Sequence, residues 1–437
     1  MDKTITYNDV INNVNTMGNC YVIAPAGCGK TKMICDIANS KNYPVLLLTH
    51  TNAGVDAMKR NINNSKVKIL TISSFVNKYV NAYKHLSELS NIEINYDNQY
   101  NGFIKLLDFS IIKDVLTYNY QLIFIDEFQD CTIEQCNIIN KISEIIPVKV
   151  FGDEMQAIFN FKRLSSFNDL LNFKPAGELN YPWRWKDNLE LGKWTIKLRS
   201  DYANNFENAI NNSNIIKITE DYFYKNYYKL LDNKSRNCII TKIKLKSINI
   251  AQRLNGYFVL EELELKDLKK LADNINTNSY KRILELLVLL KSSYVKSRNF
   301  LYKYIEKIKN NDFNFKKFKD KELSEIIFSF CNDFSKNNLK KLIIYLHNKG
   351  CRLIRFELVY YCYKLLDEYS IYNSLSEQRI KSFFSSIKRI DKNKVIAHTL
   401  LIKGLEYDNC VVFKEGLTVN ELYVAYTRAK NKLYIIV

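Results

Sequence analysis

Short apolar runs alternate with longer amphipathic stretches through the first part of this 437-residue chain. The runs are rich in Val, Ile and Leu, and they read CYVIA (20–24), PVLLLTH (44–50), VKILTI (67–72), QLIFIDE (121–127) and VKVFGDE (148–154). Strands of a parallel sheet are buried on both faces, so they show continuous apolar runs instead of alternation. The pattern predicts an α/β domain with a parallel sheet and a small insert at about 77–120.

The second part of the chain has a different pattern. From about 257 to about 394 it is rich in Lys, Leu, Tyr and Asn at helical spacing, and all five prolines lie at or before Pro182. Strand-like runs return at KVIAHTLLIKG (394–404), NCVVF (409–413) and KLYIIV (432–437). We therefore predict a second α/β domain that carries a helical insert.

The charge of the chain indicates a class of partner. Lys and Arg total 64 against 46 acidic residues, which gives a net charge of 64 − 46 = +18 and a pI of about 9.2. Such a charge favours a polyanion, with nucleic acid as the first candidate. A lysine-rich surface that is merely solvated is the alternative.

The sequence gives no signal for export or for a membrane. Its first ten residues, MDKTITYNDV, are polar, and no window approaches the ~18 continuous apolar residues of a membrane span. The ten cysteines have mostly apolar neighbours and form no CxxC pair, which is typical of reduced thiols. We expect a cytoplasmic protein with no membrane association.

A glycine-containing loop, APAGCGKT (24–31), follows the first apolar run. Glycines allow the backbone N–H groups of such a loop to surround phosphates, while Lys30 reaches the β and γ oxygens and Thr31 binds Mg²⁺. We therefore predict a P-loop. The residues expected to bind the nucleotide are Ala26, Gly27, Cys28, Gly29, Lys30 and Thr31.

Two carboxylates follow the apolar run of residues 121–125. Asp126 and Glu127 are expected at the carboxyl end of a buried strand, where open α/β sheets bind their ligands. Asp126 would hold Mg²⁺ through its water shell, and Glu127 would polarise the attacking water. With the P-loop, this pair predicts an NTPase that uses Mg²⁺; the family resemblance given next implies that the nucleotide is ATP.

The segment DEFQD (126–130) resembles the DExQD signature of superfamily 1 helicases of the UvrD/Rep/PcrA type. Six further stretches agree with that family, in the family's order: TNAGVDAM (51–58), TISSF (71–75), VFGDEMQAIFNF (150–161), LNYPWRWKDN (179–188), IKGLEYD (402–408) and LYVAYTRAKNKLYI (422–435). The resemblance implies two RecA-like domains. They would comprise residues 1–176, with a small 1B-like insert at about 77–120, and residues 177–256 with 392–437, interrupted by a helical 2B-like insert at 257–391.

The resemblance also implies catalytic roles. Gln156 stands at the place of the γ-phosphate-sensing glutamine, and Arg184 and Arg428 stand at the two arginine-finger places. An arginine finger neutralises the charge that develops on the transferring phosphoryl group. Together with Lys30 and Glu127, these residues form the expected catalytic set.

Recognition of the nucleoside is implied by three further positions. Trp183 takes the place of an aromatic residue that stacks on adenine, and Glu406 matches a ribose- or nucleotide-linked glutamate in a segment that includes Gly404. The family usually has an adenine-reading glutamine before the P-loop, whereas the first glutamine of this chain is Gln99. Either another group reads adenine or nucleotide selectivity is relaxed.

The expected contacts with single-stranded DNA rest on the resemblance as well. Thr51 and Asn52 lie in the segment that touches DNA, Phe75 ends the TISSF segment, and Phe159 and Phe161 take the places of base-stacking aromatics. For the last two phenylalanines, packing in the core is the alternative.

We therefore expect an ATP-dependent translocase and helicase that moves 3′→5′ on single-stranded or partly duplex DNA. The short inserts leave one alternative, a DNA-sensing ATPase subunit that regulates a partner nuclease, as in anti-phage defence systems such as Gabija. Strand displacement by the purified chain separates these two functions.

Overall fold

The computed structural model describes residues 6–89, 98–159, 163–200, 215–260, 272–276, 280–372, 375 and 392–437. The chain divides into two compact units. The first comprises Met1–Ile215 and Thr418–Asn431, so it extends past residue 176, the expected end of the first domain. The second comprises Ile216–Leu417 and Lys432–Val437. Parallel strand pairs in two six-stranded sheets confirm the predicted α/β class.

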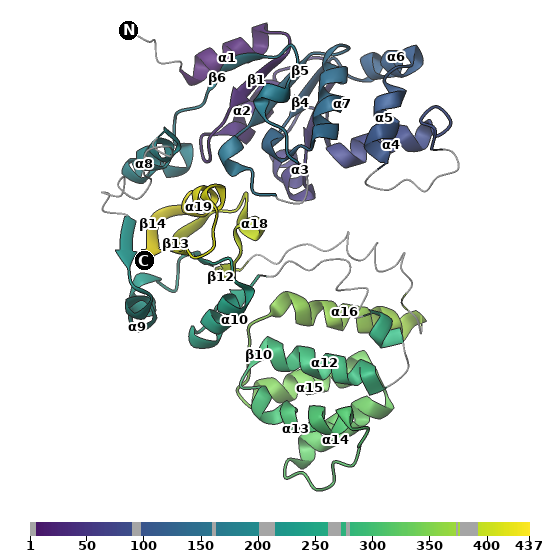
Figure 1. Ribbon diagram of the computed structural model, residues 1–437, viewed down its shortest axis with the longest axis vertical. Coiled ribbons are helices and arrows are strands. Elements are labelled where there is room, and N and C mark those ends of the chain that lie inside the picture. Colours follow the sequence, from purple (N-terminus) through teal and green to yellow (C-terminus); the bar gives the residue numbers. More distant parts are fainter. Residues whose placement is uncertain are drawn as a thin grey trace. The chain divides into compact units, whose positions relative to one another are not determined.

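The first sheet has the strand order β3-β2-β4-β5-β1-β6, and its neighbouring strands are parallel (Figure 1). Every apolar run predicted in this half of the chain is a strand. Their bounds are β1 Cys20–Ile23, β2 Val45–Thr49, β3 Val67–Thr71, β4 Leu122–Ile125 and β5 Val148–Gly152. The edge strand β6, Lys174–Glu178, was not predicted because it contains Pro175 and Gly177 and is largely exposed.

Helices cover both faces of the first sheet. On one face α1 and α2 pack with residues such as Val22, Leu47 and Phe124, and on the other α4–α7 pack with residues such as Leu46 and Ile125. The helices of the first unit, in the described part of the chain, are α1 Tyr7–Thr16, α2 Lys30–Asn39, α3 Asn52–Lys59, α4 Ile72–Ala82, α5 Gln99–Leu106, α6 Ser110–Asn119, α7 Ile133–Ser143, α8 Leu189–Ser200 and α19 Val419–Tyr426. Short 3₁₀ turns lie at η1 Phe128–Asp130, η2 Glu154–Gln156, η3 Phe167–Asp169 and η4 Trp183–Trp185.

The second sheet has the strand order β7-β14-β13-β8-β12-β9. Its central strands are parallel, with β8 paired to both β12 and β13. The strands are β7 Ile215–Ile218, β8 Asn237–Ile240, β9 Phe258–Val259, β12 Lys394–Ala397, β13 Tyr407–Phe413 and β14 Ala429–Ile436. Helices α9 Glu220–Leu230, α10 Lys244–Arg253 and α18 Thr399–Ile402 accompany them.

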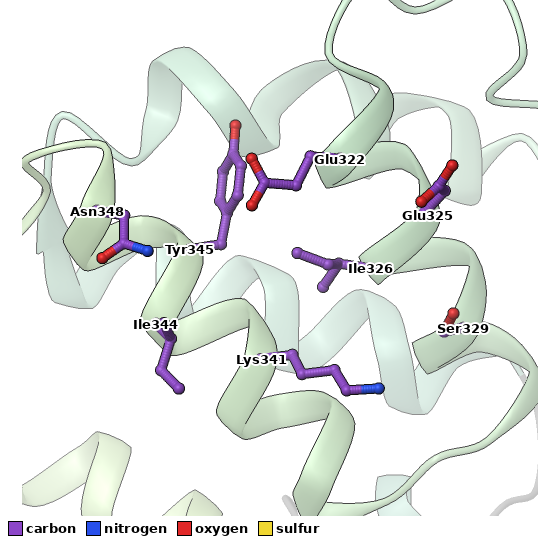
Figure 2. A pocket seen from close by; sticks show the side chains of 8 residues that line it. All are labelled: Glu322, Glu325, Ile326, Ser329, Lys341, Ile344, Tyr345 and Asn348. Carbon is purple, nitrogen blue, oxygen red and sulfur yellow. The ribbon is translucent and has the colours of Figure 1, made fainter.

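The segment between β9 and β12 contains a bundle of helices with its own core (Figure 1). It consists of α12 Tyr280–Ser293, α13 Arg298–Lys309, α14 Lys321–Asn332, α15 Lys336–Asn348 and α16 Phe356–Tyr372, with the strand pair β10 Tyr294–Val295 and β11 Arg352–Leu353. Charged side chains such as Glu322, Glu325 and Lys341 line a shallow groove of about 400 Å³ between α14 and α15 (Figure 2). None of the helices in the described part of the chain is long and apolar enough to cross a membrane.

Candidate nucleotide-binding site

The predicted P-loop connects β1 to α2. The Ala24 N–H donates to the Gly152 carbonyl at 2.8 Å, which fixes the start of the loop to the end of β5. Gly27 and Gly29 have φ values of 75° and 85°, in the left-handed region that favours glycine. Gly29 is the N-cap of α2, and Lys30 is its first residue. The loop therefore leads directly into a helix N-terminus, where free N–H groups favour an anion.

The η4 turn packs directly against this loop. The Arg184 N–H donates to the Gly27 carbonyl at 3.0 Å. A Cβ atom at Gly27 would lie 2.7 Å from Trp185 Cζ3, and a Cβ atom at Gly29 would lie 2.8 Å from Trp183 Cδ1. Both glycines are therefore required for close packing as well as for backbone conformation.

The three tryptophans have different surroundings. Trp185 is 1% exposed and donates from Nε1 to the Ala429 carbonyl at 2.7 Å. Trp194 is also buried, with its ring centroid 6.0 Å from that of Tyr426. Trp183 is 49% exposed, and its ring lies beside Tyr7 and Tyr181 at centroid distances of 6.1 and 4.5 Å. Only Trp183 of the three offers a large exposed aromatic surface beside the loop.

Lys30 forms ion pairs with both predicted carboxylates. Its Nζ atom lies 2.9 Å from Asp126 Oδ1 and 2.5 Å from Glu127 Oε1. Burial alone would lower the pKa of Lys30, but the two carboxylates outweigh it and raise that pKa above its usual value. Burial raises the pKa of Asp126, and the Lys30 charge opposes that rise. Lys30 therefore remains a cation. The two carboxylates hold it at the end of β4.

Glu127 occupies a strained backbone position. Its φ and ψ of 57° and 44° are left-handed, which is uncommon for a residue with a side chain. Its Oε2 atom accepts a hydrogen bond from Gln129 Nε2. Such conformations cost of order 1–3 kcal/mol and cluster at functional sites. The left-handed residue lies between β4 and the η1 turn, and its carboxylate is paired with Lys30.

A buried network continues from Gln129 to residues that the sequence did not single out. Gln129 Oε1 accepts from the Asp153 N–H at 2.9 Å, and Asp153 Oδ2 accepts from Gln156 Nε2 at 3.0 Å. The Tyr423 hydroxyl also donates to Asp153 Oδ2 at 3.0 Å, and Arg199 Nε lies 3.3 Å from Oδ1. Asp153 lies inside the VFGDEMQAIFNF stretch and Tyr423 inside the LYVAYTRAKNKLYI stretch, although the motif comparison assigned a role to neither, and Arg199 lies outside all of the matched stretches.

The two predicted arginine fingers both lie in the first unit. Arg184 is half-buried and donates from Nη1 to the Thr427 carbonyl at 2.6 Å. Arg428 is buried and donates from Nε to the Val424 carbonyl at 2.9 Å and from Nη2 to Thr427 Oγ1 at 2.8 Å. Arg184 therefore lies on the P-loop through its backbone, while the Arg428 guanidinium is bonded to the carboxyl end of α19, which precedes it.

Gly404 and Glu406 belong to the second unit. Gly404 has a φ of 81° in the turn between α18 and β13, and a Cβ atom there would meet no other atom within 4 Å. Glu406 is half-buried in the same turn. The left-handed backbone explains why a glycine occupies position 404. The nucleotide-binding roles of both residues stay predictions of the resemblance.

The predicted DNA contacts have different exposures. Thr51 and Asn52 are exposed at the start of α3, where Thr51 Oγ1 accepts from the Gly54 N–H at 3.0 Å. Phe75 is 0% exposed and packs against Tyr79 and Phe103, so the expectation that it contacts DNA is corrected: a buried ring has no surface for a base. Phe159 is half-buried. Phe161 lies outside the described residues.

The donor set at the loop suits a metal that is shared with phosphates. The described residues contain no cluster of three or more His, Cys, Asp or Glu side chains that could hold a metal ion. Mg²⁺ usually keeps several waters and takes one or two carboxylates plus phosphate oxygens. Asp126 at the end of β4 and Thr31 in the first turn of α2 fit that requirement.

A family model matches the first part of the chain. Residues 8–162 match the family described as AAA domain. That match contains the P-loop, Asp126, Glu127 and Gln156. No curated protein matches the chain.

Solved helicase structures are similar to the chain at low identity. Pif1 helicase from Candida albicans is 13% identical, with a TM-score of 0.42 over 99% of this chain and 94% of that one. Arterivirus nonstructural protein 10, a helicase solved in complex with DNA, is 10% identical, with a TM-score of 0.35 over 98% of this chain and 63% of that one. The helicase of PRRSV is 10% identical, with a TM-score of 0.36 over 99% of this chain and 55% of that one.

Proposed function

We propose that the protein is an ATPase that moves along single-stranded DNA and unwinds duplexes. The observation that carries the proposal is the set of ion pairs between Lys30 and the carboxylates of Asp126 and Glu127 at a P-loop. A lysine already held at the loop is placed to exchange its carboxylate partners for the β and γ phosphates of ATP. The AAA match over residues 8–162 supports the same chemistry.

Asp126 and Glu127 have separate proposed roles, in metal binding and in activation of water. Asp126, with Thr31, would hold Mg²⁺, which when bound neutralises charge on the phosphate oxygens. Glu127, released from Lys30, would accept a proton from the water that attacks the γ-phosphate. Before ATP binds, the carboxylate is held by Lys30 and by the Gln129 amide.

Arg184 is our first choice for the cation that stabilises the transferring phosphoryl group. Its backbone is bonded to Gly27, and its guanidinium donates to a neutral carbonyl, that of Thr427. A guanidinium forms stronger, charge-assisted hydrogen bonds with a phosphate than with a neutral carbonyl, which favours this role. We assign Arg428 the second arginine-finger place.

Trp183 supports a stacking role in nucleoside binding. Its exposed ring lies beside Gly29 and is flanked by Tyr7 and Tyr181. Aromatic stacking does not distinguish strongly between bases, and the chain has no glutamine before the P-loop. We therefore propose that the ring compensates in part for the missing glutamine.

The nucleic-acid part of the proposal rests on the motif order, on the net charge of +18 and on the exposed pair Thr51 and Asn52. We propose 3′→5′ movement on single-stranded DNA, driven by ATP hydrolysis, with Phe159 as a base contact. The RecA-like domains expected at 1–176 and at 177–256 with 392–437, and the insert at 257–391, are part of this proposal.

The test is ATP turnover with and without single-stranded DNA, for the wild-type chain and for Lys30→Ala. We expect DNA-stimulated turnover in the wild type and none in the variant, because the lysine charge at the phosphates is lost. Normal turnover by Lys30→Ala would refute the proposal. A strand-displacement assay then distinguishes the helicase from the regulatory subunit. ATPase activity without unwinding, together with a co-purifying nuclease, would favour the regulatory subunit.

A further inference from the structure

One side chain reaches the phosphate-binding loop from the other end of the sequence. The hydroxyl of Tyr423, on α19, accepts a hydrogen bond from the Ala26 N–H at 3.4 Å and donates one to Asp153 Oδ2 at 3.0 Å. The residue is buried. A hydroxyl that both donates and accepts inside the protein has a fixed orientation. The hydroxyl oxygen of Tyr423 therefore links the P-loop to the Asp153 side chain.

Asp153 passes this restraint on to a residue of the proposed catalytic set. Its Oδ2 atom accepts from Gln156 Nε2 at 3.0 Å as well as from Tyr423, so the two donors share one oxygen. Its backbone N–H donates to Gln129, which in turn donates to Glu127. A displacement of the Asp153 carboxylate would therefore change the orientation of the Gln156 amide.

We propose that Tyr423 is a positioning residue for ATP hydrolysis, which orients Gln156 through Asp153 and holds the Ala26 N–H of the P-loop. The inference rests on the proposed ATPase function. Burial, with the neighbouring Asp153 carboxylate, raises the pKa of the Tyr423 hydroxyl well above its usual value, so the group stays protonated and remains a donor. Removing only the hydroxyl should allow the Gln156 amide to take other orientations. The rest of the P-loop should stay in place.

The packing of α19 does not depend on this hydroxyl alone. Asn420 Nδ2 donates to the Ala157 carbonyl at 2.9 Å, and Thr418 and Glu421 form a capping box at the start of the helix. Tyr423→Phe keeps the buried ring and removes one oxygen atom. The effect expected from this variant is therefore on the rate of hydrolysis and not on folding.

Tyr426→Phe is the matched control, because it removes a hydroxyl from the same buried helix at a residue whose ring packs against Trp194. For both variants, turnover of Mg-ATP and equilibrium binding of a fluorescent ATP analogue are measured. We expect Tyr423→Phe to lower kcat about tenfold, with binding changed by less than about threefold, because two hydrogen bonds at the reacting end are lost. Tyr426→Phe should match the wild type.

A double-variant comparison tests the route through Gln156. If Tyr423 acts through Asp153 on Gln156, adding Tyr423→Phe to Gln156→Ala should cost less than about threefold, since interacting sites are not additive. Wild-type kcat in Tyr423→Phe, equal losses in both tyrosine variants, or full additivity with Gln156→Ala would overturn the inference. A wild-type chain without ATP turnover would instead overturn the proposed function, and this inference with it.

Discussion

Trp185→Phe should destabilise the first unit far more than Trp183→Phe. The Trp185 indole is 1% exposed, and its N–H is bonded to the Ala429 carbonyl at 2.7 Å. Phenylalanine would lack that donor and would be smaller by two ring carbons. At about 0.8 kcal/mol for each buried carbon group and about 1 kcal/mol for the hydrogen bond, the loss is about 2–3 kcal/mol in the free energy of unfolding.

Trp183 provides the comparison on the same turn. Half of its surface is in solvent, and no hydrogen bond from its indole to another residue is seen in the described part of the chain. Trp183→Phe should therefore change the free energy of unfolding by no more than about 0.5 kcal/mol. It should still weaken binding of a fluorescent ATP analogue, because the stacking surface beside Gly29 is smaller.

The assay is thermal unfolding without nucleotide. For a unit of this size each kcal/mol corresponds to about 2–4 °C in Tm, so Trp185→Phe should lower Tm by about 5–10 °C and Trp183→Phe by less than about 2 °C. Equal shifts in the two variants would refute the reasoning, since burial and the bond to Ala429 are the only differences on which it depends. A Trp185→Phe shift below about 2 °C would refute it as well.

Two further predictions concern the loop and its neighbours. Arg184→Ala should lower kcat about a hundredfold or more while ATP binding changes by less than about threefold, because the cation acts mainly in the transition state; parallel losses in rate and binding would count against that role. Burial, and then the Asp153 charge, raise the pKa of the Cys28 thiol to about 12, so at pH 8 it is protonated in the folded protein but partly thiolate in the unfolded chain. Mass spectrometry after iodoacetamide treatment should therefore show Cys28 labelled at least about a hundredfold more slowly without urea than with it, and equal rates would contradict the buried position of the loop.

The apolar pattern predicted the first sheet well because its strands are buried on both faces. Leu46 and Leu47 are neighbours in β2, yet they contribute to different cores, which is why the run shows no alternation. The edge strand β6 escapes this rule, since Pro175 and Gly177 are unusual in strands and an edge tolerates them. The local pattern thus identifies the strands with an apolar run, including the other edge strand β3, and misses β6, which has no such run.

The candidate site was predictable where its residues are adjacent in sequence. The P-loop and the pair Asp126–Glu127 each follow an apolar run, and the geometry of parallel strands brings them together at one end of the sheet. Tyr423 and Asp153 are 270 residues apart, and their bond has no local signature. Phe75 shows the opposite error, because a motif match identifies a residue type and not the direction in which its ring points.

The arginine between two tryptophans is explained by how the turn is held. The Arg184 N–H is fixed to Gly27, and the next residue, Trp185, is fixed to Ala429 by its buried indole. The position of the Arg184 backbone on the P-loop therefore does not depend on where its guanidinium points. Arg428 is 1% exposed, and its guanidinium is bonded to Val424 and Thr427 inside the protein. Because Arg184 is only half-buried, we expect its guanidinium to reach a bound nucleotide at a lower cost than that of Arg428, with the buried Trp185 keeping the turn in place.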